Sequence, residues 1–203
     1  SLKSNQENPN AFYSLGIIYS NIHHYQEAIT YFKEAVKFDK NNYEANLNLG
    51  AVLLKLSLFE EARTYLEISL SLNPKSYEAY FNLGQIDLYT NNFKDSENHL
   101  NKSLSLCKNN NEIYKYLAIV QFMNANKNAL INLNKSIELN PQTNISHVLR
   151  SVIKSSYESK KLTNCIRTNP YDGFGEKPII LYRDIEDELV ETLYKRNTSD
   201  LNK

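Results

Sequence analysis

The sequence lacks tryptophan and has only two cysteines, five glycines and one methionine among its 203 residues. The two cysteines, Cys107 and Cys165, form neither a disulfide framework nor a metal-ligand spacing, so we expect reduced, structural thiols. The pair Gly173 and Gly175 lacks the third glycine and the strand-to-helix setting of a dinucleotide loop. We therefore expect no cofactor and no bound metal.

Net charge is also missing, because 23 Lys and Arg residues balance 23 Asp and Glu residues. A chain without net positive charge has no general attraction for phosphates, so we expect no nucleic-acid partner. No apolar run approaches the ~18 residues that cross a bilayer, and no signal peptide is recognisable at the N-terminus. These absences favour a cytoplasmic protein without a membrane span, and Ser1 in place of Met indicates a fragment of a longer chain.

What the sequence does contain is an internal repeat of 34 residues. A leucine followed by a small residue recurs at Leu15-Gly16, Leu49-Gly50, Leu83-Gly84 and Leu117-Ala118. Further along each unit come a small residue (Ala28, Ala62, Ser96, Ala129), a large apolar one (Phe32, Leu66, Leu100, Leu133) and a second small one (Ala35, Ser69, Ser103, Ser136). This pattern predicts two closely packed helices joined by a short polar turn, with Pro74 and Pro141 closing two of the units.

After Pro141 the pattern changes phase, and a single apolar stripe follows at Ile145, Val148, Leu149, Val152 and Ile153. Such a stripe, with polar residues around it, is typical of a terminal helix that covers the core of the last repeat. We expect this capping helix over about 144–159.

The spacing over residues 9–141 resembles the tetratricopeptide repeat (TPR) family. The resemblance implies an all-α fold: a right-handed solenoid over 9–161 with repeats at about 9–42, 43–76, 77–110 and 111–143, between an extension (1–8) and a tail (162–203). Two positions depart from the family pattern, since Asn46 replaces an aromatic residue and Asp87 replaces a tyrosine. A buried, unpaired carboxylate would be costly, so Asp87 should be partly exposed or hydrogen-bonded.

The family resemblance places the first helix of each repeat on a concave groove. Residues two and three places before the small residue, one after it and four to five after it should then face a ligand. Aromatic, aliphatic and amide side chains dominate these positions, which suits a peptide better than a small metabolite. The expected peptide-binding residues are Tyr13, Ile17, Leu47, Asn48, Ala51, Lys55, Phe81, Asn82, Gln85, Tyr89, Lys115, Tyr116 and Ile119.

Asn48 and Asn82 occupy equivalent positions in this set. An amide can donate to and accept from a peptide backbone at once, so two such residues form a short asparagine ladder that ignores the ligand's side chains. This placement is similar to the TPR part of O-linked N-acetylglucosamine transferase. The Lys/Arg clamp of TPR proteins that bind chaperone tails is not matched, because Glu44, Glu78 and Glu112 line the groove's edge instead.

The tail does not continue the repeat. It has a turn-like segment at 171–175, a strand-like run at 178–182 and a helix-like run at 184–196 with Ile185, Leu189 and Leu193 on one side. Residues 165–167 and 177–188 loosely resemble the entry to the catalytic domain of collagen-type prolyl 4-hydroxylase α subunits. That family's iron site needs a His-x-Asp pair, which none of the four histidines begins.

The leading hypothesis is therefore a non-enzymatic adaptor that binds a peptide or partner helix in the groove. An alternative is the substrate-recognition region of a larger enzyme, similar to O-linked N-acetylglucosamine transferase or prolyl 4-hydroxylase, cut before its catalytic domain. A third hypothesis is regulatory: Ile185, Leu189 and Leu193 dock into the groove of this chain or of a neighbour, as a self-docking or oligomer contact.

Overall fold

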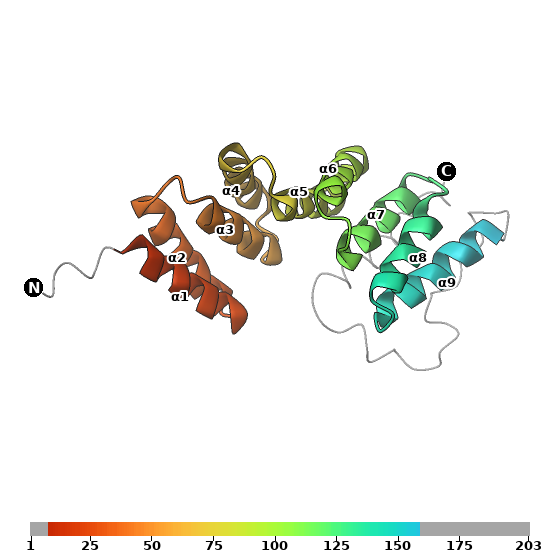
Figure 1. The fold of residues 1–203 in the computed structure, drawn as a ribbon, viewed down its shortest axis with the longest axis horizontal. Coiled ribbons are helices and arrows are strands. Elements are labelled where there is room, and N and C mark those ends of the chain that lie inside the picture. The colour runs from red at the N-terminus through yellow and green to blue at the C-terminus, as the bar shows by residue number, and fades with distance from the viewer. Residues whose placement is uncertain (1–7, 159–203) are drawn as a thin grey trace, which may run out of the picture. The chain divides into compact units, whose positions relative to one another are not determined.

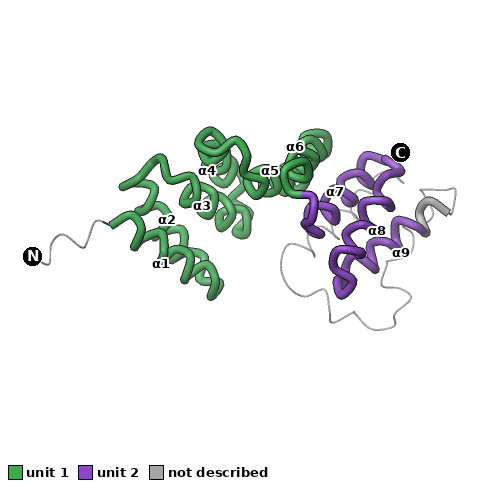
Figure 2. Tube along the Cα trace, viewed as in Figure 1, with its two compact units in different colours: residues 1–107 green, residues 108–203 purple. Residues whose placement is uncertain are grey.

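The computed structural model describes the backbone of residues 8–158 and the side chains of residues 8–154, which form nine α-helices and no strand (Figure 1). The chain divides into two compact units, residues 1–107 and 108–203 (Figure 2). The first unit contains α1 (Pro9–Asn21), α2 (Tyr25–Phe38), α3 (Tyr43–Lys55), α4 (Phe59–Leu72), α5 (Tyr77–Tyr89) and α6 (Phe93–Leu106). The second contains α7 (Asn111–Met123), α8 (Ala129–Leu139) and α9 (Asn144–Glu158).

These bounds confirm the predicted all-α repeat fold. Helices pack in sequential pairs, α1 with α2, α3 with α4, α5 with α6 and α7 with α8, and α9 then packs on α8 at the position predicted for a capping helix. Cys165, the strand-like run at 178–182, the helix-like run at 184–196 and the prolyl 4-hydroxylase resemblance all lie outside the described residues.

The first helix of each pair begins at a side-chain cap. Asn8, Asn42, Ser76 and Asn110 stand at equivalent places, and each accepts a hydrogen bond from a backbone N–H in the first turn, for example Ala45 N to Asn42 Oδ1 at 2.9 Å. Such a bond satisfies one of the N–H groups that a helix start leaves without a partner. Part of the chain's abundant asparagine therefore sets where the helices begin.

The turn inside each helix pair is the same left-handed cap in all four cases. His23, Ser57, Asn91 and Ala125 are 34 residues apart and have φ values of 62°, 58°, 62° and 54°. The next N–H reaches back to the helix, as in His24 N to Tyr19 O at 2.9 Å, which is the hydrogen-bond pattern of a Schellman cap. His23 and His24 thus lie exposed at the turn between α1 and α2.

Because only glycine adopts this backbone conformation without a steric cost, these caps offer a stability test. Ser57→Gly and Ala125→Gly are each expected to raise the free energy of unfolding by about 0.5–1 kcal/mol. Asn91→Gly serves as the control and should change it little, since asparagine tolerates the left-handed region. Urea unfolding followed by circular dichroism measures the three values, and a loss of stability in Ser57→Gly would contradict the reasoning.

Close helix contact explains the repeated small residues. A Cβ added to Gly50 would lie 2.7 Å from Leu66 Cγ, and a Cβ on Gly84 would lie 2.7 Å from Leu100 Cγ. In the first three helix pairs the large residue is fully buried against the glycine of the facing helix. The spacing of small and large residues in the sequence therefore corresponds to the real contact between the two helices.

Buried serines at the small positions are also satisfied. Ser69 Oγ donates to Tyr43 O at 3.0 Å, and Ser103 Oγ, one repeat later, donates to Tyr77 O at 2.8 Å. Each bond joins the end of a second helix to the start of the first helix of its own pair. A hydroxyl in the core thus avoids the cost of an unpaired buried polar group.

The two residues that depart from the family pattern are both buried. Asp87 on α5 has a side-chain exposure of 3% and accepts hydrogen bonds from Arg63 Nη2 on α4 and His99 Nδ1 on α6, both at 2.6 Å. These bonds hold the pKa of Asp87 below its ordinary value against the opposing effect of desolvation by burial. The expected hydrogen bonding of Asp87 is confirmed, and it joins three helices.

Asn46 is fully buried on α3. Its Nδ2 donates to Asn42 O at 2.8 Å and to Lys40 O at 3.3 Å, while its Oδ1 has no hydrogen-bond partner among the described residues. The Asn46 side chain therefore supplies a hydrogen-bond donor to two backbone carbonyl groups before α3, while its own buried carbonyl oxygen accepts no hydrogen bond from the described residues.

Candidate functional site

The predicted ligand-binding residues of the first unit lie on one side of α1, α3 and α5. Gly50 marks the side of α3 that contacts α4, and Asn48 and Lys55 lie about 160° and 140° around the helix from it. The three helices are neighbours in space, since α3 packs against both α1 and α5. We call this set the inner face, comprising Tyr13, Ile17, Leu47, Asn48, Ala51, Lys55, Phe81, Asn82, Gln85 and Tyr89.

Most of the inner face is neither fully buried nor fully exposed. Eight of its ten residues have intermediate exposure, Gln85 is buried and Lys55 is exposed. Tyr13 contacts the buried ring of Phe32, with ring centroids 6.0 Å apart, and Tyr89 stacks on Phe59 at 5.9 Å. Each of these two tyrosine rings of the inner face is therefore packed against an aromatic side chain of a second helix.

Asn48 is already hydrogen-bonded within the chain. Its Nδ2 donates to the Tyr13 hydroxyl at 3.2 Å and to Glu44 O at 3.0 Å. An amide nitrogen has two hydrogens, so both donors of Asn48 are in use and only its Oδ1 remains to accept from a ligand. Burial and the nearby Glu44 carboxylate raise the pKa of Tyr13, so the phenol stays protonated at neutral pH.

Asn82 occupies the equivalent position on α5, but its amide is open. The residue 35 places before Asn48 is Tyr13, whereas the residue 35 places before Asn82 is Leu47, which cannot accept a hydrogen bond. Within residues 8–154 no group bonds to the Asn82 side chain. The two amides that look alike in the sequence are therefore different: one is occupied by its neighbour, and the other can take a ligand.

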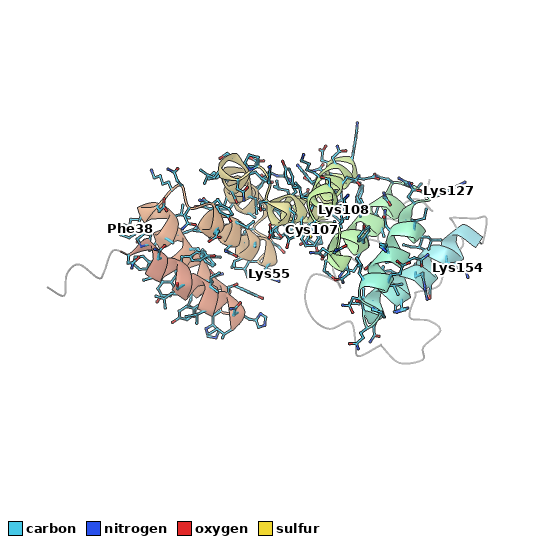
Figure 3. All side chains as sticks on the ribbon, in the orientation of Figure 1. Phe38, Lys55, Cys107, Lys108, Lys127 and Lys154 are labelled. Atoms are coloured by element: carbon cyan, nitrogen blue, oxygen red, sulfur yellow. The ribbon has the colours of Figure 1, made fainter. Side chains whose placement is uncertain are left out.

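Charge on the inner face is sparse. Lys55 is its one cation and has no acidic partner in the described part of the chain; Figure 3 shows it at the C-terminal end of α3. Glu44 and Glu78 stand in the first turns of α3 and α5, so the two charge signs lie at opposite ends of the helices. The apolar and amide groups of the inner face therefore lie between an acidic end and a basic end.

The three predicted residues of the second unit are buried. Lys115, Tyr116 and Ile119 on α7 are 4%, 6% and 1% exposed. Lys115 Nζ lies 2.7 Å from a carboxylate oxygen of Glu112 and 5.2 Å from the centre of the Tyr116 ring. Lys115, Tyr116 and Ile119 therefore present little surface to a ligand in this structure.

Sequence reasoning missed two contacts. The Tyr13–Asn48 hydrogen bond joins two predicted residues, and its only signal was a spacing of 35, one more than the repeat. The Arg63–Asp87–His99 cluster was missed because its members are 24 and 12 residues apart on three helices. Within the described side chains no three His, Cys, Asp or Glu residues gather as a metal site requires.

Comparison with known proteins agrees with this repeat architecture. Models of the tetratricopeptide repeat match residues 9–42 and residues 43–109. The chain belongs to the tetratricopeptide repeat family. A search of curated proteins found no match to this TPR chain. No helix in the described part of the TPR chain is long and apolar enough to cross a membrane.

Solved TPR structures share its fold. One is YrrB, a TPR protein with an unusual peptide-binding site, at 22% identity over 74% of this chain and 78% of that one, with a TM-score of 0.63. MamA from Desulfovibrio magneticus RS-1 is 25% identical over 68% of this chain and 79% of that one, with a TM-score of 0.62. The first TPR of Spaghetti (RPAP3), bound to the HSP90 peptide SRMEEVD, is 20% identical over 60% and 96%, with a TM-score of 0.57.

Proposed function

We propose that the chain is a non-enzymatic interaction module that binds an extended segment of a partner protein on the inner face of its first unit. The observation that carries the proposal is the open amide of Asn82 among half-exposed apolar and aromatic side chains. Such a surface can hold a peptide backbone through the amide and its side chains through apolar contact. YrrB and the first TPR of Spaghetti bind peptides on the same fold, which supports this use of it.

The composition of the inner face also selects the ligand. With one lysine and two glutamates at its edge, the face offers no cluster of positive charge to an acidic C-terminal tail. Leu47, Ala51 and Phe81 favour instead a segment whose alternate side chains are apolar. We therefore infer a neutral or weakly charged partner segment, unlike the acidic HSP90 peptide held by the first TPR of Spaghetti.

The two amides should contribute unequally to binding. A heptapeptide display library is selected on the full 203-residue chain, and the enriched peptide is labelled and titrated by fluorescence anisotropy. Asn82→Ala is expected to weaken binding about tenfold, the worth of one hydrogen bond that the free protein leaves unmade. Asn48→Ala should weaken it less, about threefold, because its donors already bond to Tyr13 and Glu44.

A matched control is Asn101→Ala, an exposed asparagine on α6, which should leave the affinity unchanged. If the Asn48→Ala and Asn82→Ala double variant still bound every selected peptide at full affinity, the asparagine ladder would be removed from the proposal. If no peptide were enriched over an unrelated protein, the inner face would lose its proposed function.

A further inference from the structure

The capping helix α9 is apolar over more of its surface than its packing covers. Leu149 and Ile153 are only 8% and 2% exposed, whereas Val148, between them and the solvent side, is 47% exposed. We call Ile145, Val148 and Val152 the α9 flank; the first and last are partly exposed. At 100° per residue the flank is centred about 90° around the helix from Leu149 and Ile153. It is therefore a second apolar side of α9 and not the edge of the buried one.

The helices of the first unit are covered on more sides than α9. Helix α3 packs on α2, α4 and α5, whereas α9 packs on α8 and is the last helix of the described residues (Figure 1). The sequence continues past α9, because 45 residues, 159–203, follow it. The α9 flank can therefore be covered by a segment of the same chain.

Residues 184–196 are the part of this tail whose sequence suits the flank. Ile185, Leu189 and Leu193 are four residues apart, so they share one side of the helix that the sequence predicts there. From the first to the third, this side extends about 12 Å along a helix, and the α9 flank extends about 10 Å. The two apolar surfaces therefore match in length.

Charge favours the second unit over the first as the docking site for this run. Residues 184–191 carry five acidic and no basic side chains. The described side chains of the second unit, 108–154, include six Lys and Arg against two Asp and Glu, and α9 contributes Arg150 and Lys154. Those of the first unit, 8–107, include eight against eleven. The acidic run is therefore attracted to the second unit and repelled by the first.

We propose that residues 184–196 dock as a helix on the α9 flank of their own chain, apolar side against apolar side. The intervening residues 159–183 can extend up to about 80 Å, several times the ~22 Å length of α9, so the connection permits the contact. A covalently joined segment has an effective concentration on the order of 1 mM, so a few apolar contacts are enough to hold it. This inference is independent of the proposed peptide binding, because the α9 flank and the inner face share no residue.

Amide hydrogen exchange of the full 203-residue chain, followed by mass spectrometry, tests the proposal. We expect residues 184–196 to exchange at least ~10-fold more slowly than the same segment as a free peptide. Val148→Glu should bring exchange within about twofold of the free peptide, because it places a carboxylate among apolar side chains and beside the acidic run. Ile131→Glu makes the same charge change at a 67% exposed position on α8 and should leave the protection intact.

The tail side of the contact is tested by Leu189→Glu with Leu193→Glu, which should abolish the protection. Adding Val148→Glu to this pair should change nothing further, since the variants remove the same contact. A wild-type run that exchanges like the free peptide would overturn the proposal.

Two other outcomes would also overturn it. Protection that survives Val148→Glu but is lost in Phe81→Glu would assign the run to the inner face. Protection that disappears on dilution from about 50 µM to about 1 µM would show that a second copy holds the run, because docking within one chain does not depend on concentration.

Discussion

Leu66→Ala is expected to lower the free energy of unfolding by about 3–4 kcal/mol. Leu66 lies on α4, is fully buried, and fills the space opposite Gly50, where even a Cβ would approach its Cγ to 2.7 Å. The space is too well packed for neighbouring side chains to close the cavity, so the lost contacts and the cavity both contribute. Urea unfolding followed by circular dichroism measures the loss.

Leu72→Ala is a matched control, since it makes the same change six residues later on the same helix at a position that is 38% exposed. It should cost no more than about 1 kcal/mol, because little apolar surface is lost from the core. Equal losses in the two variants would mean that contact with Gly50 does not determine the packing of this repeat.

Asp87→Asn is expected to lower the free energy of unfolding by about 2–3 kcal/mol at neutral pH. The variant leaves Arg63 and His99 without their shared carboxylate, although both are about 30% exposed and regain some hydration. The destabilisation should depend on pH, because the pKa of Asp87 is lowered in the folded state. A carboxyl of this kind stabilises the fold above its unfolded-state pKa, and the stabilisation is lost as pH falls through the folded-state pKa.

The wild type and Asp87→Asn should therefore approach equal stability as pH falls from about 5 to 2, where the native carboxyl takes up a proton. Urea midpoints measured at a series of pH values compare the two proteins. Asp95→Asn, an exposed acid in the first turn of α6, is the control and should change stability by under about 0.5 kcal/mol. A destabilisation by Asp87→Asn that stayed constant down to about pH 2 would show that shape, and not the ion pairs, explains the effect.

Much of the fold was predictable because its signals are local and repeated. The small residues at Gly50 and Ala62 and the large one at Leu66 recur every 34 positions, and close packing of two helices imposes that pattern wherever they lie in space. The left-handed caps were harder, since His23, Ser57, Asn91 and Ala125 share no residue type; the predicted polar turn had the right place but not this conformation.

The candidate site was only partly predictable. Helical periodicity places Asn48 and Asn82 on the same side of their helices, but it says nothing of what stands beside each amide. That depends on the preceding repeat, where Tyr13 accepts a hydrogen bond and Leu47 cannot. For Asp87 the sequence indicated that a partner was needed, without identifying Arg63 or His99.

The sequence by itself determined the repeat, the pairing of neighbouring helices and the chemistry of the inner face, because these follow from residue type at short, periodic spacing. Only the tertiary structure decided which amide is open, which groups pair with Asp87, and that Ile18 on α1 is exposed while its counterparts Val52 on α3 and Ile86 on α5 are buried. Each of these depends on contact between helices that are distant along the chain. A repeated sequence places similar residue types at equivalent positions of each repeat. The helices that pack against those positions differ, so the contacts and exposure of the equivalent residues differ as well.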